Sequence, residues 1–319
     1  MAFGKFMKGL AAAVLAATLG TAAVAEYPEK PITMIIPLGA GGSHDLNARV
    51  IASVLPSYLG QPVIVQLMPG SAGQIGTSAA AQAPADGYTI LFTQNFIDEL
   101  QQHVAELPYD PNGDFVAIAR TNFAAPSIIV KSDSSFNTIG DLVAHSKANP
   151  GSLKFGHSGN WGAFMVPGAL VFNAAGTMPT MVPHKGGGPA MQALLAGDVD
   201  VSMAFNSVID SQAGAVKALV SVSPDTQIEG VPTTAEAGLD GVDTVGIMHR
   251  VVLVRRDTPP EIVDKLRAAF AAMKEDKSYQ KLLAKLGENN VYMDGAEYEA
   301  VRVSQGEAYQ ALVKTLTGG

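Results

Sequence analysis

The sequence predicts an α/β fold with mostly parallel sheets flanked by helices. Short β-branched apolar runs alternate along the chain with segments whose apolar residues recur at helical spacing. Two such runs, residues 32–36 and 63–65, lead into glycine-rich turns, residues 37–45 and 69–76, and then into helical segments. This repeated order of strand, glycine turn and helix is typical of neighbouring parallel strands joined by crossover helices.

Composition indicates a globular protein that does not bind nucleic acid. The chain has 319 residues, of which 47% are hydrophobic and 16% charged, and this length is enough for two domains with their own cores. The formal net charge is −8 and the sequence has no cluster of Lys and Arg, which argues against nucleic acid and anionic membrane surfaces as partners. The chain has no cysteine, which excludes disulfides, thiolate catalysis and cysteine metal ligands.

The N-terminus has the pattern of an export signal. Lys5 and Lys8 precede an apolar run, residues 10–19, that is too short to cross a bilayer, and Ala23-Val24-Ala25 fits the small-residue cleavage rule. We therefore expect residues 1–25 to be a signal peptide that is cleaved after Ala25. The alternative is that this segment is retained as a membrane anchor.

The first part of the chain predicts a β-α-β-α-β unit. Its strands are expected at residues 32–36, 63–65 and 88–92, and its helices at residues 45–59 and 75–83. Ser43 or Asp45 is a candidate N-cap of the first helix, and Gly60 follows the end of that helix.

The rest of the chain continues the alternation. Further strands are expected at residues 127–130, 153–155, 180–182, 199–205, 216–222 and 251–254, and helices at residues 139–147, 164–175, 189–196, 260–273, 279–286 and 296–315. Thr258-Pro259-Pro260-Glu261 has the pattern of a helix start. Two of these strands again lead into glycine-rich loops, residues 156–162 and 183–188.

The four glycine-rich loops predict a binding site for a small anion. Glycine lets a ligand approach the backbone closely, and backbone N–H groups at a helix start carry partial positive charge. In open α/β sheets such ligands collect at the carboxyl ends of the strands. The loops also hold the polar donors Ser43, Ser71, Ser158 and Asn160, the cation Lys185 and the only tryptophan, Trp161. The simpler alternative is that the loops are plain tight turns and that Trp161 lies in the core.

Little in the sequence indicates an enzyme. Residues 156–160, Gly-His-Ser-Gly-Asn, are similar to a nucleophile elbow around Ser158 but lack its last glycine. The phosphate-binding, dinucleotide-binding and zinc-binding motifs are absent from the sequence, and its six histidines lack metal-ligand spacing. We therefore expect neither a cofactor nor a metal. The alternative is a secreted serine hydrolase in which Ser158 uses a histidine from one of the glycine loops.

Several short motifs occur in a fixed order along the chain. They are Tyr27-Pro28-x-Lys30-Pro31-Ile32-Thr33, Gly41-Gly42-x-x-Asp45-x-x-Ala48-Arg49, Leu59-Gly60-Gln61-Pro62-Val63, Pro69-Gly70-x-x-Gly73-x-x-Gly76, Ala83-Pro84-x-Asp86-Gly87-Tyr88-Thr89, Val182-Pro183-x-Lys185-Gly186-x-x-Pro189-Ala190 and Leu195-x-Gly197-x-Val199-Asp200. In this order they resemble the periplasmic solute-binding receptors of tripartite tricarboxylate transporters, the TctC or Bug family. The resemblance covers nearly the whole mature chain.

The resemblance implies a two-lobed periplasmic-binding-protein fold of type II, also called a Venus flytrap. Domain 1 would comprise residues 27–124 and 243–319, and domain 2 residues 125–242. Such a receptor is not an enzyme. It would act as a monomer in the periplasm, capture a di-, tri- or aromatic carboxylate between its lobes, and deliver it to the large and small integral membrane subunits of a transporter. The alternative within this fold is a carboxylate sensor that presents its closed form to a membrane kinase.

The resemblance also places the ligand. Family members hold carboxylates with backbone N–H groups and hydroxyls, without a clamping arginine. On this chain one wall of the site would be formed by Ala40, Gly41, Gly42, Ser43, Gly70, Ser71 and Ala72. The other lobe would contribute Ser158, Asn160, Trp161, Lys185 and Gly186. Thr93, Asn95 and Asn206 would add side-chain contacts at strand ends.

The chain departs from the family pattern in three places. Leu67-Met68 stands where an asparagine usually introduces the second loop, and His184 stands where a tyrosine usually precedes the lysine. Trp161 and Phe164 are more apolar than the small polar residues that are usual there. A larger acid, above all an aromatic one, would suit stacking on Trp161.

Overall fold

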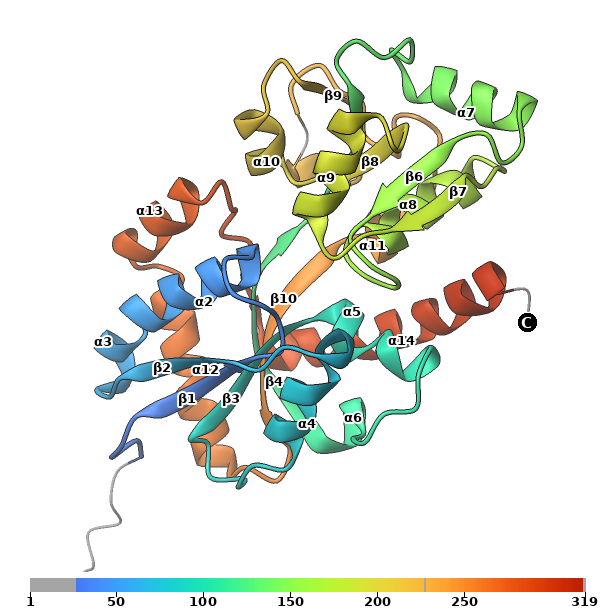
Figure 1. Cartoon of the computed structure of the whole chain (residues 1–319). Helices are drawn as coiled ribbons and strands as arrows, with labels where there is room; N and C mark the ends of the chain where they lie inside the picture. Colours follow the sequence, from blue (N-terminus) through green and yellow to red (C-terminus); the bar gives the residue numbers. More distant parts are fainter. Residues whose placement is uncertain (1–26, 227, 318–319) are drawn as a thin grey trace, which may run out of the picture.

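The computed structural model describes residues 27–226 and 228–317, so the predicted signal peptide and its cleavage site lie outside the described residues. The chain forms two lobes, each built on its own sheet (Figure 1). The six-stranded first sheet has the order β11-β4-β10-β3-β1-β2, and the five-stranded second sheet has the order β7-β6-β8-β5-β9. The α/β class predicted from the sequence is confirmed.

The first lobe is the first sheet with the helices around it. Its strands are β1 (Ile32–Ile36), β2 (Val63–Leu67), β3 (Thr89–Gln94), β4 (Phe115–Ala124), β10 (Met248–Arg255) and β11 (Met293–Asp294). Its helices are α2 (Ser43–Val54), α3 (Pro56–Leu59), α4 (Gln74–Ala81), α5 (Asn95–Asp98), α6 (Pro111–Asp114), α12 (Pro260–Met273), α13 (Lys277–Lys285) and α14 (Gly295–Thr317).

The second lobe is the second sheet with its own helices. Its strands are β5 (Ser127–Lys131), β6 (Lys154–His157), β7 (Thr180–Pro183), β8 (Val201–Ala204) and β9 (Val216–Ser221). Its helices are α7 (Ile139–Ala148), α8 (Met165–Ala174), α9 (Gly187–Ala196) and α10 (Asn206–Ser211). A short helix, α11 (Val242–Val245), packs against both α8 and α14 and so contacts both lobes. The predicted domain boundary at residue 243 falls inside this helix and stays a prediction.

Each sheet is mixed rather than mostly parallel. Strands β1, β2 and β3 pair in parallel in the first lobe, and β6, β7 and β8 do so in the second. Strands β4, β10 and β11 in the first sheet, and β5 and β9 in the second, make only antiparallel pairings with their neighbours. Connectivity accounts for the antiparallel pairing of β4 with β10. Strand β4 leads out of the first lobe toward the second and β10 leads back into the first, so the two neighbours run in opposite directions.

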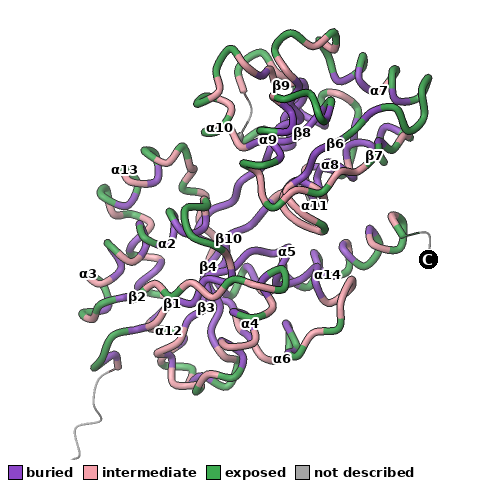
Figure 2. The backbone as a smooth tube through the Cα atoms, viewed as in Figure 1, coloured by how far each residue is buried: buried purple, intermediate pink, exposed green. Residues whose placement is uncertain are grey.

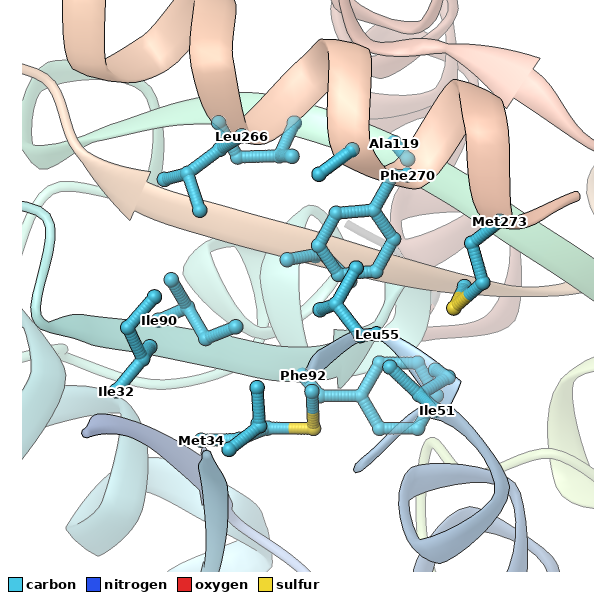
Figure 3. Packing of buried hydrophobic residues seen from close by; sticks show 14 of the residues in the cluster. Ile32, Met34, Ile51, Leu55, Ile90, Phe92, Ala119, Leu266, Phe270 and Met273 are labelled. Carbon is cyan, nitrogen blue, oxygen red and sulfur yellow. The ribbon is translucent and has the colours of Figure 1, made fainter. Parts of the chain in front are cut away.

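Apolar layers hold each sheet between helices. In the first lobe α2 and α12 cover one face, where Leu266 and Phe270 of α12 pack with Leu55 near α2 and with Phe92 of β3 (Figure 3). Ala80 of α4 and Tyr298 of α14 belong to a separate cluster with Ile35, Leu91 and Leu253, which covers the other face. Burial is concentrated along the strands of both sheets (Figure 2). The strands therefore form rigid supports for the loops at their ends.

The predicted elements occur close to their predicted positions, with two instructive differences. Pro56 divides the single helix predicted over residues 45–59 into α2 and α3, because proline removes the N–H that an interior helical residue would donate. The prediction that Ser43 or Asp45 caps α2 is wrong, since the N-cap is Gly42 and makes no side-chain cap. Likewise α12 has Pro259 as its N-cap without a side-chain hydrogen bond.

Candidate functional site

All four glycine-rich loops lie at the carboxyl ends of parallel strands. The first loop (residues 37–42) follows β1 and the second loop (68–73) follows β2, and these strands are parallel neighbours. The third loop (158–164) follows β6 and the fourth loop (184–186) follows β7, which are also parallel neighbours. Thr93 and Asn206 lie at the ends of β3 and β8, next to these pairs, and Asn95 begins α5. Each lobe therefore gathers its predicted site residues at one edge of its sheet.

Backbone conformation sets these loops apart from the rest of the chain. Among the described residues, only Ser71, Ala72 and Trp161 have a positive φ without being glycine, at 46°, 53° and 56°. All three are predicted site residues. A left-handed backbone costs a residue with a Cβ on the order of 1–2 kcal/mol, and such strain is found preferentially at ligand-binding positions.

The first loop is closed by an internal carboxylate. The Gly41 N–H donates to Asp45 Oδ2 at 2.8 Å, and Asp45 also pairs with Arg49 at 2.9 Å. Ala40, Gly41 and Gly42 are exposed and Ser43, the first residue of α2, is half-buried. Because the first N–H groups of a helix have no intrahelical acceptor, the start of α2 provides anion donors that Gly41 itself no longer provides.

A buried arginine lies directly behind the first loop. Arg250, in the middle of β10, has an exposed fraction of 0% and donates to the Ser43 hydroxyl at 3.0 Å. It forms a two-point ion pair with Glu288, at 2.8 Å for each contact, and also donates to Asn122 at 3.3 Å. Neither Arg250 nor Glu288 was predicted from the sequence. A single arginine in an apolar strand carries no local motif, and Glu288 belongs to a distant segment after α13.

Two predicted contacts at strand ends are buried. His44, next to Ser43, lies with Nε2 3.0 Å from the Thr93 carbonyl, and burial together with Arg250 lowers the pKa of His44 to about 3. The ring is therefore neutral, and its Nε2–H donates to the carbonyl. Asn95 is fully buried and donates to the Ile247 carbonyl and the Tyr309 hydroxyl, while its oxygen accepts from the His249 N–H. In this conformation the Asn95 side chain makes its hydrogen bonds to groups of the protein itself.

The second loop is a left-handed turn pressed against the first. Gly70, Ser71, Ala72 and Gly73 have positive φ in succession, and Ser71 and Ala72 are exposed. The side-chain amide of Gln101 donates to the Ala72 carbonyl at 3.4 Å and so helps to hold the turn. Gly76, just inside α4, sits so close to Pro37 and Met68 that an added Cβ would lie 2.9 Å from Pro37 Cα and 2.8 Å from the Met68 carbonyl. Glycine here allows the two loops to pack together.

In the second lobe the loops are shaped mainly by aromatic side chains. Phe164 packs edge-on against Phe205 with ring centroids 5.2 Å apart, and it lies next to Gly187 at the start of α9. The His157 Nδ1–H donates to the Gly159 carbonyl at 3.0 Å and turns the third loop. Within the third and fourth loops, Ser158 and Gly186 are half-buried, while Asn160 and Lys185 are exposed.

Trp161 lies between the lobes. It is half-buried and packs against a cluster that contains Phe96 of α5 and Tyr309 of α14 from the first lobe, and Val166 of α8 from the second. Its position therefore differs from a core tryptophan of one lobe, which the sequence left open as the simpler alternative.

A small pocket marks the junction of the lobes near Asn206. It has a volume of about 30 Å³ and is lined by the chain from β4 to β5, by residues 205–207 and by residues 287–289, which include Glu288. The lobes meet closely here, because an added Cβ at Gly287 would lie 2.9 Å from Ser207 Cβ. A larger surface cavity of about 360 Å³, lined by Lys131, His145 and Asp200, lies at the opposite strand ends of the second lobe and shares no residue with these loops.

The hydrolase alternative needs a contact between Ser158 and a histidine, and a metal site needs a cluster of ligands; both can be checked in the residues that the structure describes. Across residues 27–226 and 228–317, no hydrogen bond joins the Ser158 hydroxyl to a histidine, and the neighbouring His157 is engaged with Gly159. No group of three His, Asp or Glu side chains in the same residues could hold a metal ion. None of the helices that the structure describes is both long and apolar enough to cross a membrane. The fold and the paired loop edges define a two-lobed solute-binding receptor.

Comparison with known proteins identifies the family. The family model of the tripartite tricarboxylate transporter family receptor, TctC, matches residues 47–317. The chain is 32% identical over 279 residues to a UPF0065 protein of Agrobacterium vitis, covering 85% of this chain and 79% of that protein. It is 31% identical over 283 residues to BugT of Bordetella pertussis, covering 86% of each. The chain belongs to the TctC family of periplasmic solute-binding receptors, which are not enzymes.

Solved structures show the same fold. MatC from Rhodopseudomonas palustris, solved with bound malate, is 25% identical with a TM-score of 0.77, and the match covers 90% of this chain and all of that one (100%). A second R. palustris protein, solved with adipate, is 26% identical with a TM-score of 0.77, covering 92% of this chain and 98% of that one. The two-lobed fold implied by the sequence motifs is thus confirmed.

Proposed function

We propose that this protein captures a small organic carboxylate between the loop edges of its two lobes and delivers it to the large and small membrane subunits of a tripartite transporter. The observation that carries the proposal is the strained backbone at Ser71, Ala72 and Trp161. Strain of this kind persists only where the surrounding structure enforces it, and here it occurs at three positions of the proposed site and nowhere else among the described residues.

The chemistry of the loops suits a carboxylate. The starts of α2 and α9 present backbone N–H groups, and Ser43, Ser71 and Ser158 add hydroxyl donors. Gly42, Gly70 and Gly186 allow the ligand to approach the backbone, and Lys185 supplies a cation from the second lobe. The structural relatives that contain malate and adipate agree with a carboxylate as the ligand class.

The mechanism is binding coupled to closure of the lobes. A ligand shifts the equilibrium toward the closed form only through contacts that it makes with both lobes at once. The first lobe would hold the carboxylate, where each charge-assisted hydrogen bond contributes about 1.5–3 kcal/mol, and Trp161 would contact the carbon skeleton. The indole ring favours a larger acid, including an aromatic one, over the smallest dicarboxylates.

The proposed cellular setting follows from the N-terminus and the family. The mature receptor would begin after Ala25, act as a monomer in the periplasm, and comprise domain 1 (residues 27–124 and 243–319) and domain 2 (125–242). A carboxylate sensor would present the same closed form to a membrane kinase. Identifying the membrane partner, transporter subunits or kinase, would distinguish transport from sensing.

A thermal-shift screen of the mature protein tests the proposal. We expect malate, adipate, citrate or benzoate to raise the melting temperature, because ligand at 100 times its Kd stabilises a fold by about 2.7 kcal/mol. The uncharged amides of the same acids are the control and should give no shift. Trp161→Ala should abolish the shift for the best acid. If ligand-free, folded protein responds to no carboxylate, the proposal is wrong.

A further inference from the structure

Arg250 connects the first loop to the strand that runs between the lobes. It lies at 0% exposure in β10, and its guanidinium contacts the Ser43 hydroxyl, Glu288 and Asn122. Asn122 belongs to β4, the strand that leads directly into the second lobe, and Glu288 lines the pocket where the lobes meet. One buried side chain therefore joins the proposed carboxylate site to both segments at the junction of the lobes.

The direction of the Arg250–Ser43 hydrogen bond is fixed by chemistry. A guanidinium has only donors, so the Ser43 oxygen must accept, at 3.0 Å. The hydroxyl hydrogen then cannot point at Arg250 and remains available to another acceptor. Ser43 is half-buried at the first position of α2, where the helix start faces an exposed glycine loop.

Arg250 also changes the electrostatic potential at the start of α2, although its charge is paired with that of Glu288. The pair is held at two points of 2.8 Å, and Glu288 itself is only 11% exposed. The charge of Arg250 is still felt at the start of α2, where it contributes with burial to the lowered pKa of His44. A hydroxyl that accepts from a cation becomes a stronger donor to an anion.

We propose that Arg250 is a positioning residue that holds the Ser43 hydroxyl as an outward-directed, polarised donor for the ligand carboxylate. Arg250 does not touch the ligand. It acts through Ser43 and sets the affinity for the anion from behind the loop. The proposal deepens the carboxylate-receptor function proposed above and rests on it.

A double-mutant cycle tests this coupling. We would measure Kd by titration calorimetry, using the best binder among malate, adipate, citrate and benzoate, for Ser43→Ala, Arg250→Lys and the two combined. Lysine keeps the charge opposite Glu288 but lacks the fork that reaches Glu288, Asn122 and Ser43 together. Each single change should weaken binding about 10-fold, and the combination should be no weaker than the worse single change.

Two further variants separate positioning from general stability. Ser43→Thr keeps the hydroxyl and should bind within about 3-fold of the unmodified protein, but not when combined with Arg250→Lys. Arg302→Lys disturbs another arginine at 0% exposure, which donates to Asp98, Glu299 and the Pro111 carbonyl rather than to a loop residue, and should leave Kd within about 2-fold. If Arg250→Lys does not fold, Arg250→Met with Glu288→Met removes both charges together and takes its place in the cycle.

The outcomes distinguish the two proposals. If the unmodified protein binds none of the acids, the carboxylate-receptor function itself fails. If it binds and the effects of Ser43→Ala and Arg250→Lys multiply to about 100-fold, or if Arg250→Lys leaves Kd unchanged, the receptor function stands and the positioning role of Arg250 is overturned.

Discussion

The two lobes hold their ligand loops by different physical means. In the first lobe polar contacts fix the loops: Asp45 closes on the Gly41 N–H, Arg250 binds Ser43, and His44 anchors to the end of β3. In the second lobe Phe164 and Phe205 pack beside the start of α9, and Trp161 packs against a cluster shared with the other lobe. The strand–loop–helix units of the two lobes are similar, but polar contacts hold the loops of the first lobe and aromatic packing holds those of the second.

This difference indicates a division of labour within the proposed site. Hydrogen bonds fix donors to within tenths of an ångström, which suits recognition of a carboxylate whose geometry is the same in every ligand. Aromatic packing tolerates side-chain movement and presents an apolar surface, which suits a carbon skeleton that differs between ligands. The first lobe would thus set the ligand class and the second the particular acid.

The largest expected effect comes from a matched pair of glycines, one in each lobe. Gly76→Ala would place a Cβ 2.8 Å from the Met68 carbonyl and 2.9 Å from Pro37 Cα, both of which are backbone atoms. We expect the free energy of unfolding to fall by about 2 kcal/mol, as for other overpacked sites. Gly187→Ala meets only the ring of Phe164, at 2.8 Å, and should cost less than about 1 kcal/mol because a side chain can move.

Urea denaturation of both variants measures these free energies, and the thermal-shift screen reports on ligand binding. Gly76→Ala should also lose the carboxylate response, because it separates the first loop from the second. Equal losses of stability in the two variants would contradict the view that fixed contacts hold the loops of the first lobe and movable aromatic side chains those of the second.

Much of the fold was predictable because it depends on local periodicity. The β-branched runs before the first two glycine loops became β1 and β2, since such runs bounded by glycine admit few other structures. The ten-residue strand β4 was not predicted. It contains Arg120, Thr121 and Asn122 among buried apolar residues, and its pairing with β10 depends on partners more than a hundred residues away.

The site was predictable only in part, for the same physical reason. Glycine and serine in loops after strands carry a local signal, so the four loops could be named from the sequence. Arg250 and Glu288 carry none, because their importance arises from a contact at 2.8 Å between β10 and the segment after α13. Asn95 was predicted as a ligand contact on the basis of its position, whereas its hydrogen bonds depend on Tyr309 in the last helix.

A second prediction concerns the pH dependence of the polar first lobe. Burial lowers the pKa of His44 and of His249 to about 3, so both gain a proton only on unfolding as the pH falls below 6.5. Burial beside Asp98 raises the pKa of Glu99 to about 8, so the folded protein holds that proton between pH 4.5 and 8. Stability due to Glu99 therefore rises as the pH falls toward 6.5, and stability due to the histidines falls below it.

Taken alone, these three groups predict a maximum of stability near pH 6.5. Burial also lowers the pKa of His157 and of His103, which adds to the loss of stability below that pH. Below it the three groups together take up one net proton on unfolding, and the free energy of unfolding should fall by about 2 kcal/mol at pH 4.5. Urea denaturation at pH 8, 6.5 and 4.5 measures this. Glu99→Gln mimics the protonated acid at every pH and so removes the stabilisation that Glu99 provides as the pH falls. The loss of unfolding free energy between pH 6.5 and 4.5 should then roughly double. A stability that is constant from pH 8 to 4.5 would show that these groups are not buried as described.

The smallest expected effect tests the strain in the second loop. Ala72→Gly relieves a left-handed residue at φ 53°, and we expect the free energy of unfolding to rise by about 1 kcal/mol. Carboxylate affinity should fall at the same time, because a more flexible loop must be ordered when the ligand binds.

Two controls make that result specific to the loop. Ala79→Gly lies in the regular helix α4 and should lose about 1 kcal/mol, since glycine is a poor helix former. Trp161→Gly relieves a similar strain at φ 56° in the second lobe but also removes a ring that packs between the lobes, and it should therefore give no gain. If Ala72→Gly loses stability as Ala79→Gly does, the second loop is not strained, and the observation that carries the proposed site is lost with it.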